Sequence, residues 1–273
     1  MRRQEVAGRV IAITGGARGI GRATAQQLAA RGARVAIGDI DAETARATAT
    51  ELGVEWAWLD VTDRASVAAF LDEVTRRLGA VDVLVANAGV MALWPLVDEP
   101  AEVTEHQLDV NVRGALHCLQ EALPRFEAGA GGQVVIMSSV LGKAGLPGAA
   151  VYSATKHAVI GLAHAARRET SRRVRISVVA PSLVATELAA GVRRRGLVPI
   201  LDPDDVAATI VGVVERPRAE VVRPRWLAAL LRARVVLPTW VVEAFIVALG
   251  GSRLLRDHDR HERGRYHHRA FRR

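Results

Sequence analysis

The sequence is poor in cysteine, aromatic residues and long apolar runs, and each shortage argues against a class of protein. The single cysteine, Cys118, allows no disulfide within the chain, and we interpret it as a small core residue of a protein from a reducing compartment. Aromatic residues make up only 4% of the chain, which gives little support for base stacking in a nucleic-acid site. The apolar segments 226–231 and 235–249 are too short and too interrupted to span a bilayer.

The N-terminal residues also lack an export signal. Two arginines lead directly into an alternating apolar segment, without the apolar core and small-residue cleavage site of a secretory leader. We therefore expect a cytoplasmic protein. With 273 residues, half of them hydrophobic, the chain can bury one sizeable core, and we expect a single domain.

Basic charge is concentrated at the C-terminal end. Residues 216–273 carry 14 basic and 5 acidic side chains, a balance of +9, whereas residues 1–215 carry 23 and 24, a balance of −1. We expect residues 1–215 to form the core, with a substrate loop near 182–202, and residues 216–273 to form a basic, partly apolar helical extension of the same domain. Three roles fit this extension: covering a pocket, burying a subunit interface, or peripheral contact with a membrane. Nucleic-acid binding is the weakest interpretation of its charge.

Short runs rich in Val, Ile and Ala alternate with stretches of helical periodicity. Nearly continuous apolar strands indicate a sheet covered on both faces, and alternation of strand and helix indicates a parallel, doubly wound sheet. The predicted fold class is therefore a Rossmann-like α/β domain with a C-terminal helical extension. Predicted helix starts are marked by Asp41, by Thr62 or Asp63, and by Asp202 before Pro203. The predicted strands are Val10–Thr14, Val35–Gly38, Trp56–Leu59, Val81–Ala86, Val134–Met137 and Ile176–Ala180, and the predicted helices are Gly21–Arg31, Ala42–Leu52, Arg64–Leu78, Glu102–Phe126, Val151–Thr170 and Asp204–Glu215.

A glycine-rich turn, TGGARGIG, follows the first predicted strand over residues 14–21. Glycine permits positive φ in a tight turn and leaves room for a pyrophosphate at the N-terminus of the next helix. The spacing matches neither GxGxxG nor a P-loop, so the turn alone is weak evidence for a nucleotide site. Asp39 ends the second predicted strand, where a carboxylate would bind an adenosine ribose and repel a 2′-phosphate, which predicts NAD rather than NADP. Arg18 is the opposing signal, and we interpret it as a solvated side chain.

Tyr152 and Lys156 are four residues apart on a predicted helix and therefore share one face. A free tyrosine, with a pKa of about 10, is a poor base at neutral pH, but a neighbouring ammonium favours the phenolate. Lys156 is one of only two lysines among 37 basic side chains, which indicates that this position needs a compact charge. The alternative is an incidental surface pair, so the surrounding sequence has to decide.

The segment VVIMSSVLGKAGLPGAAVYSATKHAVIGL, with Ser139 13 residues before Tyr152, resembles the catalytic region of the short-chain dehydrogenase/reductase family. Further motifs match in order over residues 7–190. TGGARGIG resembles the glycine motif of the family, and Asn111 resembles its helix asparagine. Asp60-Val61 resembles the adenine contact of the family and Asn87-Ala88-Gly89 its NAG motif. The chain has Pro181-Ser182 where the family usually has Pro-Gly.

The resemblance implies an NAD(H)-dependent oxidoreductase that interconverts a secondary alcohol and a ketone by hydride transfer. It implies that Tyr152 is the general acid/base and that Lys156 lowers the pKa of Tyr152 and binds the nicotinamide ribose. Ser139, which the spacing favours over Ser138, would hold the substrate oxygen, and Asn111 would relay protons through water. The implied cofactor-binding residues are Gly15, Arg18, Gly19, Ile20, Gly21, Asp39, Ile40, Asp60, Val61, Asn87, Ala88, Gly89, Tyr152, Lys156, Pro181, Val184 and Thr186.

The substrate is expected to be an apolar alcohol or ketone, such as a steroid, terpenoid or acyl compound, and the protein a homo-oligomer, either dimer or tetramer. Two alternatives stay open. An NADPH-dependent ketoacyl reductase of lipid synthesis is disfavoured by Asp39, and a non-catalytic dinucleotide-binding sensor is disfavoured by the complete catalytic set. The residues expected around the substrate are Val90, Met91, Leu93, Trp94, Leu141, Leu146 and Leu183.

The last residues combine arginines with four histidines, at positions 258, 261, 267 and 268. Metal binding requires a defined ligand geometry, and we do not expect it here. We interpret the stretch as a polar helix or tail. The cluster Arg193–Arg195 lies in the expected substrate loop, where we expect its charge to face solvent rather than an acidic substrate.

Overall fold

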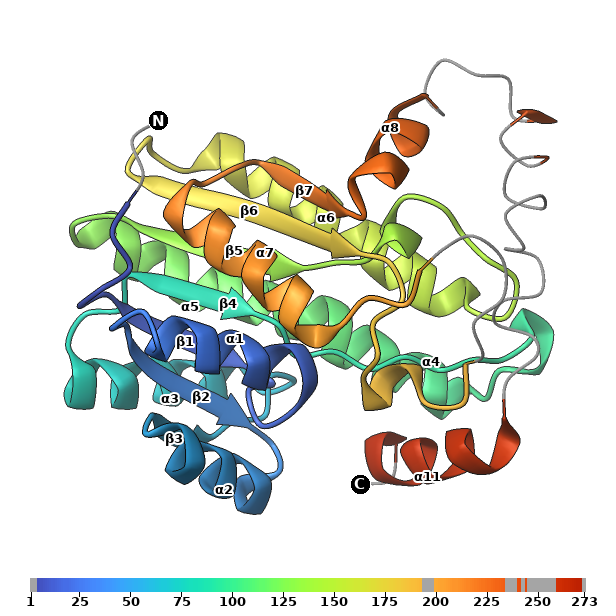
Figure 1. The fold of residues 1–273 in the computed structure, drawn as a ribbon, viewed down its shortest axis with the longest axis horizontal. Helices are drawn as coiled ribbons and strands as arrows, with labels where there is room; N and C mark the ends of the chain where they lie inside the picture. The colour runs from blue at the N-terminus through green and yellow to red at the C-terminus, as the bar shows by residue number, and fades with distance from the viewer. Residues whose placement is uncertain (1–3, 193–198, 234–239, 242–243, 245–258, 272–273) are drawn as a thin grey trace.

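The computed structural model describes residues 4–192, 199–233, 240, 241, 244 and 259–271. A parallel sheet lies at the centre, with strand order β3-β2-β1-β4-β5-β6-β7 and helices on both faces (Figure 1). The strands are β1 Val10–Thr14, β2 Arg34–Asp39, β3 Glu55–Trp58, β4 Val83–Ala86, β5 Gly132–Met137, β6 Val174–Pro181 and β7 Glu220–Arg223. The α-helices are α1 Gly19–Ala29, α2 Ala42–Leu52, α3 Arg64–Leu78, α4 Ala101–Leu108, α5 Gly114–Ala128, α6 Ala150–Glu169, α7 Pro203–Glu215, α8 Arg225–Ala233 and α11 Arg260–Phe271. Short helical turns are η1 Leu96–Asp98, η2 Asp109–Arg113, η3 Val140–Gly142 and η4 Glu187–Ala189.

The predicted fold class is confirmed, and all six predicted strands belong to the sheet. Sequence analysis missed the seventh strand, β7, which pairs with β6 at one edge. β7 has only four residues, and glutamate and arginine are at its ends, so it lacks the apolar run that marks the other strands. The sheet thus continues into the part of the chain that we expected to be a helical extension.

Aspartate side chains begin three helices where the sequence predicted them. Asp41 accepts a hydrogen bond from Thr44 N at the start of α2, and Asp63 and Asp202 cap α3 and α7 in the same way. Such caps satisfy N–H groups that have no partner within the helix. At the other end of α2, Gly53 adopts a left-handed conformation with φ of 65°. Both ends of α2 are therefore set by local sequence.

The core has one layer on each face of the sheet. Alternate residues of β1 point to opposite faces: Val10 and Ala12 pack with α3, α5 and α6, whereas Ile11 and Ile13 pack with α1 and α7. Cys118 is buried in the first layer, and burial raises the pKa of its thiol to about 12. It occupies the core position expected for it.

The predicted helix Glu102–Phe126 is interrupted in the structure. The π-helical turn η2 separates α4 from α5, and Asn111 is its central residue. A π-turn widens the helix by one residue and often occurs at functional sites. The hydrophobic periodicity of the sequence does not reveal a π-turn, so a single helix was predicted here.

The C-terminal elements lie near the carboxyl ends of the strands. In Figure 1, α8 follows β7, and α11 lies beside α4. None of the described helices is long and apolar enough to cross a membrane. The Arg193–Arg195 cluster and His258 fall outside the described residues, as does most of the predicted apolar segment 235–249.

Candidate active site

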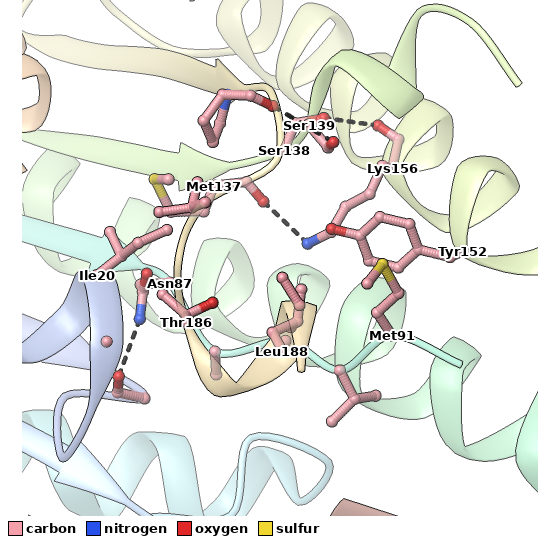
Figure 2. A pocket seen from close by; sticks show the side chains of 18 of the residues that line it. Ile20, Asn87, Met91, Met137, Ser138, Ser139, Tyr152, Lys156, Thr186 and Leu188 are labelled. Carbon is pink, nitrogen blue, oxygen red and sulfur yellow. Dashed lines mark hydrogen bonds between the residues drawn. The ribbon is translucent and has the colours of Figure 1, made fainter. Parts of the chain in front are cut away.

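A cavity of about 710 Å³ lies beyond the carboxyl ends of the strands, the usual ligand position in a doubly wound sheet. The predicted cofactor residues line it, with the single exception of Gly21. Tyr152, Lys156 and Ser139 line the same cavity, so residues from β5, η3 and α6 meet those of the glycine turn (Figure 2). Leu93, Trp94 and Asn111, which were also predicted at the site, do not line this cavity.

Three glycines shape the turn after β1. Gly15 has a φ of +62°, and a Cβ there would come within 2.8 Å of Ala88 Cα. Gly19 has a φ of +51°. A Cβ on Gly21 would overlap the carbonyl oxygen of Gly15, so Gly21 serves close packing rather than the cavity surface. The turn brings the N-terminus of α1 to the cavity with no side-chain cap, which leaves its N–H groups available to an anion.

The turn is joined to the residues after β4 by hydrogen bonds. Thr14 Oγ1 accepts hydrogen bonds from Asn87 N at 3.0 Å and from Ala88 N at 3.1 Å. The Asn87 side-chain amide donates to Gly15 O at 2.9 Å, as Figure 2 shows. These bonds hold the two loops at the point where the strand order reverses.

Asp39 and Arg18 lie at the end of the cavity near β2. Asp39 accepts hydrogen bonds from Ala17 N at 3.1 Å and Asp41 N at 3.2 Å, and burial raises the pKa of its carboxyl. The interpretation of Arg18 as a solvated side chain was wrong. Its guanidinium donates to Asp41 Oδ2 at 2.5 Å and to Thr44 Oγ1 at 2.6 Å. The hydrogen bond from Thr44 N to Asp41 and this pairing with Arg18 hold the pKa of Asp41 down at about 2.

Tyr152 and Lys156 are both buried on one face of α6. The Lys156 ammonium nitrogen lies 5.6 Å from the centroid of the Tyr152 ring and donates to Met137 O at 3.1 Å. Burial raises the pKa of Tyr152, against the opposing effects of the Ser139 hydroxyl and the positive charge of Arg263. Burial lowers the pKa of Lys156 to about 8. A titratable phenol therefore faces the cavity close to a buried amine.

The two neighbouring serines have different partners. Ser138 donates to the carbonyl of Lys156 at 2.9 Å and thereby ties β5 to α6. Ser139 accepts from Leu141 N at 3.1 Å and makes a longer contact of 3.4 Å to Pro181 O. Because Ser139 also acts on the ionisation of Tyr152, its hydroxyl is the one placed beside the phenol. Both serines line the cavity.

Asn111 lies behind the cavity wall. Its carbonyl accepts from Val90 N at 2.9 Å, and its amide donates to Val90 O at 2.8 Å and Thr155 Oγ1 at 3.1 Å. A Cβ on Gly89 would come within 3.1 Å of Asn111 Oδ1 and 3.3 Å of Lys156 Nζ. Asn111 is therefore close to Lys156, but its visible role is to hold the loop after β4.

Ser182 fits its unusual position without strain. Among the described residues, only glycines have positive φ. Ser182 N donates to Arg223 O at 2.8 Å, and its side chain contacts Pro199 O at 3.3 Å. The serine therefore links β6 to the end of β7 where the family usually has glycine.

The C-terminal elements form part of the cavity wall, which is one of the three roles left open for the extension, although none of their residues was predicted at the site. Leu227, Leu230 and Leu231 of α8 line the cavity. Residues of α11 line it as well: Tyr266, Arg269 and Ala270. The stretch expected to be a polar helix or tail is thus a helix that contributes to the site. A second tyrosine, in a chain with only two, is the sequence signal that could have drawn attention to it.

Comparisons with known proteins find similar chains over most of the described core. A family model described as short chain dehydrogenase matches residues 9–196. Cis-4-hydroxycyclohexanecarboxylate dehydrogenase from Sinomonas cyclohexanicum is 36% identical over 251 residues, covering 89% of this chain and 96% of that protein. Sorbitol dehydrogenase from Cereibacter sphaeroides is 41% identical over 184 residues, covering 66% and 72%. A crystal structure of a short chain dehydrogenase/reductase from Burkholderia phymatum in complex with NAD superposes with a TM-score of 0.78 at 25% identity, covering 85% of this chain and 95% of that one.

Proposed function

The chain belongs to the short chain dehydrogenase family of oxidoreductases, and we propose that it oxidises a secondary alcohol to a ketone with NAD, or catalyses the reverse reaction. One observation carries the proposal: Tyr152, Lys156 and Ser139 share a single cavity with the glycine turn after β1. A proton-transferring group and a dinucleotide cradle are the two parts that this reaction needs.

The cradle fits a dinucleotide. Gly15 and Gly19 leave the space that a Cβ would fill, and the uncapped N-terminus of α1 offers N–H groups for the pyrophosphate. Asp39 and Ile40 would receive the adenosine ribose, and Asp60 and Val61 the adenine. The other predicted cofactor residues on the cavity wall would hold the nicotinamide half: Asn87, Ala88, Gly89, Pro181, Val184 and Thr186.

The charges at the β2 end favour NAD over NADP. The Asp39 carboxylate would repel a 2′-phosphate, and Arg18, the nearby cation, is already bound to Asp41. A 2′-phosphate would have to displace Asp41 to reach this guanidinium. The pairing removes the strongest sequence argument for NADP.

The chain's own residues move the proton, while the bound cofactor supplies the hydride acceptor or donor. In oxidation, Tyr152 Oη accepts the hydroxyl proton of the substrate, and in reduction the same phenol returns it to the ketone oxygen. The Ser139 hydroxyl holds the substrate oxygen in place. When Lys156 is protonated, its positive charge favours the phenolate. Asn111 keeps the loop beside Lys156 in position.

Apolar side chains around Tyr152 favour an apolar substrate frame. Met91, Leu141 and Leu146 pack with Tyr152 in one cluster, and α8 adds three leucines to the cavity wall. The names of the relatives suggest cyclic or open-chain alcohols of modest size as first probes. The oligomeric state and membrane contact predicted from the sequence stay predictions.

Turnover and cofactor binding together test the proposal. The wild-type protein with NAD⁺ and a panel of cyclic and open-chain secondary alcohols should produce NADH, whereas Tyr152→Phe should bind NADH normally and produce none. Normal turnover by Tyr152→Phe would show that another group moves the proton. Tight NADH binding with no turnover of any substrate would favour the dinucleotide-binding sensor instead.

A further inference from the structure

Helix α11 places a buried phenol in the wall of the cavity that holds Tyr152. Tyr266 is 6% exposed, and its hydroxyl oxygen accepts a hydrogen bond from Met91 N at 3.0 Å. A tyrosine hydroxyl also has a proton to donate, and among the described residues none accepts it. Buried polar groups in proteins almost always find a partner. Because Tyr266 lines the cavity, this donor is available to a ligand held there.

The position of this phenol is fixed by Arg263, which lies one helical turn earlier. The guanidinium carbon of Arg263 is 4.6 Å from the centroid of the Tyr266 ring. Its two terminal nitrogens donate to Leu188 O at 2.8 Å and to Met91 O. Arg263 thus joins α11 to η4 on one side of the cavity and to the loop after β4 on the other. A donor held in this way is preorganised for a ligand.

Tyr266 is also close to the reacting group. Met91 belongs to the same apolar cluster as Tyr152, and its backbone N–H donates to the Tyr266 hydroxyl. Burial raises the pKa of Tyr266, so its hydroxyl keeps its proton at neutral pH and stays a donor. The cavity therefore has two phenols, and the catalytic role falls to the one beside Lys156 and Ser139.

We propose that Tyr266 is a substrate-binding residue that donates a hydrogen bond to a second oxygen of the substrate, distinct from the oxygen that reacts at Tyr152. This inference rests on the function proposed above and narrows its substrate class to alcohols or ketones with an apolar frame and one further oxygen acceptor. A pocket built to bond such an oxygen discriminates against a substrate that lacks it. The competing explanation is that Tyr266 only anchors α11 to Met91 N.

Matched pairs of substrates separate these explanations. Cyclohexane-1,4-diol has a second hydroxyl group where 4-methylcyclohexanol has a methyl group. Cyclohexane-1,3-diol and 3-methylcyclohexanol differ in the same way. Tyr266→Phe should lower kcat/KM for the preferred diol about fivefold, mainly through KM, and change the methyl compounds by less than about twofold. Arg265→Gln, an exposed position on the same helix, is the matched control and should change neither. Equal losses for both members of each pair would overturn the proposal.

A binding experiment needs no turnover and so distinguishes failure of this inference from failure of the proposed function. The chain has two tyrosines, so Tyr152→Phe leaves Tyr266 as the only one. With ¹³C-labelled tyrosine and NAD⁺ present, a diol should shift the single Cζ resonance, and the methyl compounds should shift it much less. A resonance unmoved by either diol, or moved equally by diol and methyl compound, would overturn the assignment even if the enzyme is active.

Discussion

Cofactor preference should depend on the ion pair between Arg18 and Asp41. Asp41→Asn keeps an acceptor for Thr44 N at the start of α2 but removes the nearer of two carboxylates beside Arg18, the other being Glu187 at 3.8 Å. A unit charge about 4 Å from a guanidinium is worth about 4 kcal/mol at an effective dielectric constant of about 20. Both side chains are about one third exposed, at 34% and 33%. Solvent and salt should therefore reduce the gain to about 1–2 kcal/mol, or about five- to thirtyfold in NADPH affinity.

Equilibrium binding of NADH and NADPH, followed by protein fluorescence, tests this expectation without a substrate. NADH affinity should stay within about twofold, because the contact proposed between Asp39 and the ribose 2′-hydroxyl is untouched. Glu51→Gln is the matched control, since it releases Arg22 from a 2.5 Å surface pair and changes the net charge equally. An NADPH affinity that is unchanged in Asp41→Asn, or improved as much in Glu51→Gln, would refute the reasoning.

Three further expectations concern proton transfer and stability. Arg263→Gln removes a positive charge that lowers the pKa of Tyr152, so the rise of alcohol oxidation with pH should move to higher pH, whereas Arg265→Gln leaves the profile in place. Gly161→Ala should raise the free energy of unfolding in urea by about 0.5–1 kcal/mol, because a Cβ within α6 meets nothing within 4 Å there; a lower value would contradict this. Burial lowers the pKa of His267 from 6.5 to about 4, so its contribution to stability is complete above about pH 6.5 and is lost as the pH falls toward 4. The free energy of unfolding should therefore fall more steeply over that range in the wild type than in His267→Gln, and equal slopes would exclude this cause.

The parts of the fold that the sequence predicted well are those determined by local chemistry. Helices α2 and α3 match their predicted bounds because an aspartate cap begins each and a glycine follows each. The buried strands were found because apolar runs are required in a sheet covered on both faces. In contrast, η2 and β7 depend on contacts between distant segments. Neither a π-turn nor a short, half-polar edge strand produces a recognisable hydrophobic periodicity in the sequence.

The candidate site divides in the same way. Its motif residues converge as predicted because they follow successive parallel strands, whose carboxyl ends meet at one edge. The interpretation of Arg18 failed because its partner Asp41 lies on the next strand-helix unit. The sequence pattern did not identify the site residues of α11, because a segment dominated by arginine and histidine is predicted to be exposed to solvent. Only the folded chain shows that Arg263 and Tyr266 are its buried side chains.

Helix α11 is held at the cavity through backbone carbonyls, so the side chains that line the cavity there can be substituted without loss of these bonds. Arg263 bonds the backbone carbonyls of Met91 and Leu188, not their side chains. Substitution of either side chain should therefore reshape the cavity without removing the bonds that hold α11. The removal of Arg263 itself is different, because one side chain that bonds both sides of the cavity would be lost, although Arg269 would still pair with Glu187 and Tyr266 would still accept from Met91 N. We infer that single side chains can change the shape of the cavity, because several bonds hold α11 in place: those of Arg263, the hydrogen bond from Met91 N to Tyr266 Oη and the ion pair between Arg269 and Glu187.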